Sequence, residues 1–584
     1  MRQHILTTAL AAAVSALAFG QNLNPTVEVT NAYEGGASSI SKPAQQMAVP
    51  DSVTRFNLDF DYSVFEKPFK GAYEFRPYYV QLKPEPMANT EEKFYLRAGA
   101  GFTLHPELDL VWSPVRKEKF RLNVYATHGS YFGRYHQFAP GEIVEGVQTI
   151  VPSGDKMKGY LTDTKAGVDA AYGWDGGVAT LDVAYRHRMA ENAWHFQRMN
   201  GVEAKARVRS LPSGEPHFLY DVAVDYHFMG NDLSHSYLTA NEYTAELTES
   251  AFRLDGTFGP VFDEERRILV DLDMDLARYR GDYSGYTGLL SATPKYQFSM
   301  DRWRFSLGAK VAAIIYSDDF NLWTDRHKSG TVYPDVHIDY HLLDDRLILQ
   351  TSATGGDRFN TFSGRFFERP FSYEGDYGHS MERIRAMIGA RGNIASRFRF
   401  DLQGGYARWA YARVDGFNCV FIPTGELGSP VFIDPDGFVV PALREKAFNL
   451  WFAELDYGWK SESVTVDGRL AWRHTNIKGD GVFAPAAVTG FIRPAYNWGE
   501  RVKAGLDVAW STRRKATFTN DAGDVVDNYV VPGWVDLGLF AEYRFTHRFG
   551  FWAKGGNLLN QAVQRTPLVA EAGMYFTAGI LLNF

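Results

Sequence analysis

Apolar and polar side chains alternate along most of the chain. The alternation starts at Phe94, and its sharpest case is the stretch 270–276, where Val, Leu, Met and Leu alternate with aspartates. A period of two is the pattern of a β-strand, whose successive side chains point to opposite faces. The aspartate face would be the wet surface of a soluble sandwich or the water-filled lumen of a barrel. The pattern therefore predicts an all-β chain and leaves two architectures to separate.

The last strand, residues 574–584, repeats this pattern and ends on an aromatic ring. One face is apolar throughout, and Leu581 alone is out of place on the other face. In a membrane, a terminal ring can complete a lipid-facing band. Part of this strand also resembles the C-terminal signal by which outer-membrane β-barrels are recognised by their assembly machinery, which we therefore expect as a partner during biogenesis. The residues that carry this assembly signal are Thr577, Gly579, Leu582 and Phe584.

Connections between the predicted strands alternate in length. Counted back from Phe584, every second connection is tight, as at 546–548 and 461–462, and the intervening ones are mostly longer, as at 129–159 and 409–445. Outer-membrane barrels have short periplasmic turns and long extracellular loops, whereas a Greek-key sandwich would not keep this two-sidedness. We predict a transmembrane antiparallel β-barrel of about 22 strands.

A closed barrel is also what the physics of a bilayer demands of such strands. In hydrocarbon every backbone N–H and C=O must be paired within the protein, so strands cross only as a barrel without an edge. A tilted strand crosses with about 9–11 residues, which matches the alternating runs. No apolar run after the leader reaches the ~18 residues of a spanning helix. We expect outer-membrane lipid to contact the apolar faces.

The N-terminal residues predict export from the cytoplasm. Residues 1–20 have a basic start at Arg2, an apolar middle and small residues before a cut after Gly20, which describes a signal peptide. Residues 21–93 are richer in Pro and Asn than the barrel region 94–584. Composition does not choose between a periplasmic extension and a segment that plugs the lumen. The expected location is the outer membrane of a Gram-negative bacterium.

Composition argues against a nucleic-acid-binding protein and against a disulfide-stabilised fold. The net charge of −8 is dispersed, and no basic stripe suggests a nucleic-acid partner. Cys419 is the only cysteine, which excludes a disulfide framework.

The hairpin at the C-terminus resembles the last hairpin of TonB-dependent receptors. The resemblance is carried by Asn557-Leu558-Leu559-Asn560, by Pro567 and by the final strand from Gly573. It implies a large barrel filled by an N-terminal plug, and import of siderophores, vitamins or glycans with energy passed on by TonB. Residues 21–93 are too few for a complete plug, so we predict a plug-less or reduced-plug relative.

A short string near the mature N-terminus resembles the box through which such receptors contact TonB. An ordinary extended segment would have the same β-branched composition, so both interpretations stay open. The residues of this string are Thr26, Val27, Glu28, Val29 and Thr30.

The loop 356–379 is the most distinctive candidate site. It is rich in arginine and aromatic residues, which are typical of interface hot spots and of stacking contacts. The alternative is that the loop folds inward and seals the pore. The loop 409–445 is similarly apolar and suggests a lid or a partner contact. The candidate residues of the first loop are Arg358, Phe359, Phe362, Arg365, Phe366, Phe367, Phe371 and Tyr373.

Motifs for catalysis and for metal binding are missing from the sequence. There is no G-x-S-x-G elbow, no H-E-x-x-H, no phosphate-binding glycine pattern and no Cys/His metal spacing. The Asp-Pro-Asp-Gly of residues 434–437 lacks the further ligands of a calcium loop. His337 and His341 share a face with Asp335 and Asp339, and as lumen residues they need no special role. We predict no enzyme activity, no cofactor and no metal.

Two functions remain. The first is solute transport through the barrel, which rests on architecture. The second is a scaffold or accessory subunit that docks outer-membrane lipoproteins, and it is motivated by the short N-terminal segment, because an open lumen of this size would leak. Conductance measurements and affinity purification distinguish the two.

Overall fold

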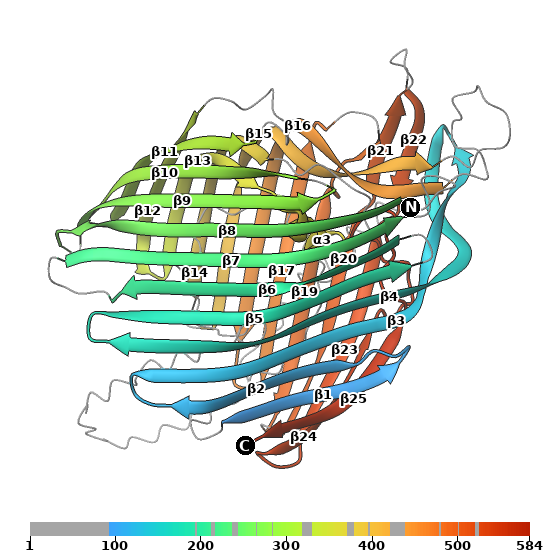
Figure 1. The fold of residues 1–584 in the computed structure, drawn as a ribbon, viewed down its shortest axis with the longest axis horizontal. Coiled ribbons are helices and arrows are strands. Elements are labelled where there is room, and N and C mark those ends of the chain that lie inside the picture. The colour runs from blue at the N-terminus through green and yellow to red at the C-terminus, as the bar shows by residue number, and fades with distance from the viewer. Residues whose placement is uncertain are drawn as a thin grey trace, which may run out of the picture. The chain divides into compact units, whose positions relative to one another are not determined.

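The computed structural model describes most of the barrel region. The described residues are 93–192, 195–211, 217–235, 243–263, 265–282, 284–317, 330–370, 379–394, 397–420, 438–477, 481–499, 501–519 and 525–584. Within these ranges the strands join into one sheet, and 22 of them form a closed antiparallel barrel (Figure 1). No helix of the described part is long and apolar enough to cross a membrane. The predicted fold class is confirmed.

The strands follow one another around the wall in chain order, each paired with its predecessor. The barrel strands are β1 (Phe94–Phe102), β2 (Glu107–Arg116), β3 (Phe120–Val144), β4 (Val147–Trp174), β5 (Gly177–Asn192), β6 (His195–Ser210), β7 (His217–His235), β8 (Tyr243–Val261), β9 (Arg266–Gly281), β10 (Gly285–Met300), β11 (Trp303–Tyr316), β12 (Thr331–Asp345), β13 (Leu347–Phe359), β14 (His379–Ile394), β15 (Phe398–Val420), β16 (Phe438–Lys460), β17 (Val464–Thr475), β19 (Val488–Trp498), β20 (Val502–Ser511), β23 (Trp534–Arg544), β24 (Phe549–Gly556) and β25 (Tyr575–Asn583).

Four further elements lie in the connections on the long-loop side. They are α3 (Phe362–Glu368), β18 (Val482–Phe483), β21 (Arg514–Thr519) and β22 (Val525–Val531).

The alternation of side chains separates lipid from lumen, as β9 illustrates. Leu272 faces outward with 38% of its surface exposed. Its neighbour Asp273 faces the lumen, where it accepts a hydrogen bond from Ser291 (3.0 Å) and pairs with Lys310 (3.3 Å). Lys295 pairs in the same way with Asp271 (2.7 Å). Lumen charges are thus paired across strands, while apolar faces look toward the bilayer.

The two ends of the barrel differ in the expected way, but two of the predicted long loops, 129–159 and 409–445, are largely strand. Short turns join strands at one end, such as those between Lys460 and Val464 and between Arg544 and Phe549. The predicted long loop at 129–159 is wrong, because β3 and β4 continue through it as a paired hairpin. The hairpin gains a further partner, because β4 pairs in parallel with β22 through Gln148 and Tyr529. Ladder pairing thus extends these strands well beyond the bilayer.

The barrel closes between its first and last strands. β1 pairs antiparallel with β25, from Tyr95 opposite Asn583 to Phe102 opposite Phe576. The Phe584 carbonyl oxygen accepts hydrogen bonds from the N–H groups of Lys93 (2.5 Å) and Phe94 (2.8 Å). The terminal residue is therefore part of the ladder.

Trp552 of β24 lies across this seam. Its Nε1 donates to the Ile580 carbonyl (3.2 Å), and the Arg97 guanidinium lies 3.6 Å from the centre of its ring. A Cβ added at Gly99 would come within 2.4 Å of that ring. The glycine thus leaves room for an aromatic side chain that spans β25 and reaches β1.

Substitution of Gly579 by alanine is expected to impair closure. The added Cβ would lie 2.0 Å from the Ala98 carbonyl oxygen on the neighbouring strand, so the ladder must shift at its seam. We expect a severalfold lower yield of folded, heat-modifiable barrel on denaturing gels. The control is Gly173→Ala, because a Cβ at Gly173 meets nothing within 4 Å. Equal folded yields would contradict a steric role for Gly579.

Candidate functional site

A segment after β13 lies inside the barrel against its inner wall. It comprises residues 360–370 and contains α3, hereafter the α3 segment. Thr361 begins the helix as N-cap, with its side-chain oxygen accepting a hydrogen bond from the Gly364 N–H (3.0 Å). Such a cap satisfies one of the free N–H groups of the first turn. The side chains of this short helix are largely buried, which indicates a docked element.

Glu249 of β8 holds the first turn of α3. Its carboxylate accepts hydrogen bonds from the N–H groups of Phe362 (2.8 Å) and Ser363 (3.2 Å) and from the Ser363 hydroxyl (2.5 Å). His227 Nε2 lies 2.6 Å from the same carboxylate. The Glu249 side chain is only 2% exposed. A buried carboxylate with this many partners is satisfied in place, and if α3 leaves it keeps only His227 of β7 among the partners named here.

Aromatic rings of α3 fill apolar patches of the wall. Phe362 packs with Leu247, Ala251, Ala277 and Tyr279 on β8 and β9. These wall positions face the lumen, where the alternation rule predicts polar side chains. Their apolar character is explained by the helix that covers them.

Phe366 fills a second patch of the same kind. It packs with Ala190, Met199 and Met229 on β5, β6 and β7, and Val569 from a later loop packs against this group. The α3 segment therefore covers the inner wall from β5 to β9.

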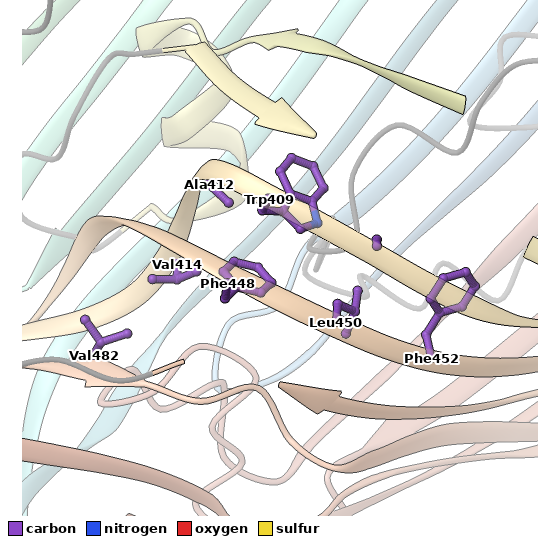
Figure 2. Packing of buried hydrophobic residues seen from close by; sticks show 8 residues of the cluster. Trp409, Ala412, Val414, Phe448, Leu450, Phe452 and Val482 are labelled. Atoms are coloured by element: carbon purple, nitrogen blue, oxygen red, sulfur yellow. The ribbon is translucent and has the colours of Figure 1, made fainter. Parts of the chain in front are cut away.

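Apolar side chains also line the inner wall on β15 and β16 (Figure 2). Trp409 and Phe448 lie on these two strands, and Val482 of β18 packs with them from the loop side. The full cluster is Ala407, Trp409, Ala412, Val414, Phe448, Leu450, Phe452 and Val482.

Two arginines of β5 meet the C-terminal end of α3. The Arg186 guanidinium lies 3.7 Å from the centre of the Phe367 ring, and that of Arg188 lies 5.0 Å from the same ring. Arg188 Nη1 also donates to the Phe367 carbonyl oxygen (3.3 Å). Cation–π contacts of this kind gain strength where water is excluded.

Carboxylates attach the end of the α3 segment to the opposite part of the wall. Glu368 pairs with Arg358 of β13 (3.1 Å). Arg369 pairs with Asp415 of β15 (2.9 Å), and the other oxygen of Asp415 pairs with Arg514 of β21 (3.1 Å). Asp415 thus joins the α3 segment to Arg514 of β21.

The loop 557–574 connects β24 to β25, and most of its central residues 563–570 are buried. Arg514 Nη2 donates to the Arg565 carbonyl oxygen (2.7 Å), and Trp534 Nε1 donates to the Gln564 carbonyl oxygen (3.0 Å). The Arg565 side chain pairs with Asp536 (2.6 Å). Through Arg514 and Asp415, this loop is connected to the α3 segment.

Glu571 of the same loop has a carboxyl pKa that is shifted by its burial. Its carboxylate pairs with Arg565 (2.9 Å). Burial nevertheless raises the pKa of Glu571 above its ordinary range, against the opposing effect of the arginine.

Comparisons with known proteins bear on the fold. No protein-family model matches the sequence, and no curated protein matches it. The FrpB iron transporter of Neisseria meningitidis superposes with a TM-score of 0.60 at 9% identity, covering 84% of this chain and 81% of that one. The siderophore receptor PiuA of Acinetobacter baumannii gives a TM-score of 0.58 at 10% identity, with coverages of 84% and 82%. The copper transporter OprC gives 0.57 at 12%, with coverages of 84% and 80%.

The barrel has the fold of TonB-dependent receptors. At these identities the likeness concerns the fold, and it confirms the resemblance that the last hairpin indicated. A TonB-dependent receptor barrel lies in the outer membrane of a Gram-negative bacterium, which agrees with the predicted location. The similar structures named above are transporters or receptors rather than enzymes. On this fold, the α3 segment and loop 557–574 lie at the extracellular end.

The candidate residues from the sequence divide into two groups. Arg358, Phe359 and the described residues of α3 come together inside the barrel. Phe371 and Tyr373 lie outside the described residues, as do residues 1–92 with the signal peptide, the N-terminal segment and Thr26–Thr30. Most of the loop 409–445 belongs to β15 and β16, and its remaining residues 421–437 also lie outside the described part.

Sequence reasoning missed the wall residues that hold the α3 segment. Glu249, Asp415 and Arg188 are separated from α3 by long stretches of chain, and each looks like an ordinary lumen charge. One signal was available: lumen-facing positions such as Met199 and Leu247 are apolar near the long-loop end. A lumen position that is apolar needs a covering element.

Proposed function

We infer that the chain takes part in solute transport across the outer membrane, with the α3 segment and loop 557–574 as the seal of its extracellular end. The observation that supports this most is the attachment of the α3 segment to opposite parts of the wall, through Glu249 on one side and Asp415 on the other. A loop held by discrete polar contacts in a lumen can leave when those contacts are replaced.

Similar structures suggest the first solutes to test. Their names include an iron transporter, a siderophore receptor and a copper transporter. We extend to this chain the class of metal ions and their chelates. In this proposal Thr26–Thr30 contact TonB, and the barrel assembly machinery recognises Thr577, Gly579, Leu582 and Phe584.

A scaffold role is the second candidate, and one observation favours it. Phe362 and Phe366 dock on apolar wall patches, and such packing suits a permanent seal. A permanently sealed barrel would serve as a platform for outer-membrane lipoproteins. Affinity purification from detergent with mass spectrometry tests this, and a barrel that always purifies alone would count against it.

Planar-bilayer conductance tests the transport proposal. The intact chain is compared with a variant in which residues 361–369 are replaced by a glycine-serine linker of equal length. Transport through a loop-sealed lumen predicts small or no currents from the intact barrel and large, steady currents from the variant. A matched control inserts the same linker at the Glu145–Gly146 turn of the β3–β4 hairpin. Silence of both the intact chain and the loop variant would overturn the transport proposal.

A further inference from the structure

Arg188 presents an unused binding edge beneath the α3 segment. Its side chain faces the lumen from β5 and is 2% exposed. Nη1 donates to the Phe367 carbonyl oxygen (3.3 Å). Nε and Nη2 have no hydrogen-bond partner among the residues that the structure describes. A guanidinium that is buried with open donors is costly unless an acceptor reaches it.

The Nε–Nη2 edge of a guanidinium is the edge that binds an oxyanion through two hydrogen bonds. Nε–H and Nη2–H point in parallel, so they can hold a carboxylate or phosphate by two hydrogen bonds. Arg469 uses this edge on Asp456 in the same lumen (2.5 and 2.7 Å), and Arg253 uses it on Asp255 (2.8 and 3.1 Å).

Arg188 differs from these arginines in its carboxylate partner. Its described ion pair joins Nη1 to Asp163 at 3.7 Å, so the pair leaves the Nε–Nη2 edge unused.

Asn231 adds a further open donor at the same level of the wall. Arg188, Met199 and Asn231 are in register across β5, β6 and β7. The Asn231 side chain is 4% exposed, and its Oδ1 accepts a hydrogen bond from Gln197 Nε2 (2.9 Å). Its Nδ2 has no partner within the described part of the chain. Two side chains on one inner face therefore offer donors without acceptors.

The α3 segment covers this part of the wall. The Phe367 ring lies over the guanidinium groups of Arg186 and Arg188, and Phe366 packs on the side chains of Met199 and Met229. An aromatic ring occupies the faces of the cations but gives their N–H edges no acceptor. Departure of α3 would uncover the side chains of Arg188 and Asn231.

We propose that Arg188 and Asn231 form an oxyanion-binding site that the α3 segment masks in the sealed barrel. The ligand carries a carboxylate or phosphate group, with two oxygens on Arg188 Nε and Nη2 and an acceptor on Asn231 Nδ2. This inference rests on the proposed function, because the ligand reaches the site after α3 leaves. Ligand and α3 compete for the same wall, so binding favours the open lumen by mass action.

Calorimetry on detergent-purified full-length protein tests the site, with inorganic phosphate and malonate as probes at constant ionic strength. Glu249→Gln supplies the unmasked barrel, and its affinity is expected to exceed that of the intact chain about tenfold or more. Adding Arg188→Gln to this variant is expected to abolish the gain. Adding Arg469→Gln is expected to leave it unchanged, because Asp456 already occupies that edge.

Each outcome separates this site from the proposed function. If Glu249→Gln conducts ions but binds neither probe, the oxyanion site is wrong and the transport proposal stands. If both arginine substitutions weaken binding equally, general lumen electrostatics explains the result and the site is overturned. If Glu249→Gln does not fold, the linker variant of residues 361–369 replaces it as the unmasked barrel. Probe binding by a folded but non-conducting variant supports the site and counts against transport.

Discussion

Replacing Glu249 with glutamine is expected to release α3 from the barrel wall. The amide oxygen of glutamine can keep the two N–H donors of Phe362 and Ser363, which share one oxygen of the carboxylate. Its NH2 group replaces the other oxygen, which accepts from the Ser363 hydroxyl and faces His227, and the negative charge is lost. Hydrogen bonds to a charged group contribute about 1.5–3 kcal/mol each, and removing the charge weakens all of those that hold α3. These hydrogen bonds contribute a large share of the free energy that holds a short docked segment. Hydrogen exchange measured by mass spectrometry should show faster exchange over 361–369.

A control on the same strand separates this effect from a general loss of charge. Glu246 is exposed near the start of β8, and its substitution by glutamine removes the same charge without touching α3. We expect Glu246→Gln to exchange like the intact chain. Unchanged protection of the amides in the Glu249 variant would show that the carboxylate does not hold the helix.

Replacing Asp415 with asparagine is expected to loosen both inward loops together. Asp415 is the carboxylate between Arg369 of the α3 segment and Arg514, which also donates to the Arg565 carbonyl oxygen. A neutral amide leaves two buried guanidinium groups facing each other, at a cost of about 3–5 kcal/mol. We expect faster hydrogen exchange in residues 361–369 and in loop 557–574.

The matched control is Asp467→Asn in the lumen wall. Asp467 pairs with Arg399 (3.1 Å), and both side chains are half-buried away from the two loops. This variant should leave exchange in both loops unchanged. The double variant of Asp415 and Glu249 then measures coupling, because effects of independent sites add and those of coupled sites do not. Loosening of one loop alone would contradict a shared attachment at Asp415.

The sequence predicted the barrel well because its cause is local. A two-residue period follows from the pleat of a strand, and lipid on one side with water on the other makes the period visible, as at Leu272 and Asp273. The C-terminal strand was predicted for the same reason. Its one exception, Leu581, is a lumen-facing side chain that is buried.

The contacts of the α3 segment could not be predicted, because their cause is not local. Glu249 and Phe362 lie 113 residues apart, and no short-range pattern links them. The arginines and phenylalanines of 356–379 fitted an exposed contact surface as well as an inward fold. Wall positions such as Met229 and Leu247 decide between an exposed and an inward-folded loop. Their apolar character is informative only once the strand order and the lumen-facing positions are known.

The β3–β4 hairpin was predicted as a loop for a related reason. Proline and glycine residues between Pro140 and Gly154 are typical of loops. Pairing with each other and with β22 nevertheless keeps these residues in strands. Long-range pairing overrode the local preference.

The tip of the β3–β4 hairpin is suited to carrying an inserted peptide. The tip turns at Glu145 and Gly146, both with positive φ, far along the strands from the register that closes the barrel. A foreign peptide placed at this turn would stand clear of the bilayer and leave the strand pairing of the wall intact. The tip is therefore the natural place on this molecule for an epitope that antibodies reach on living cells.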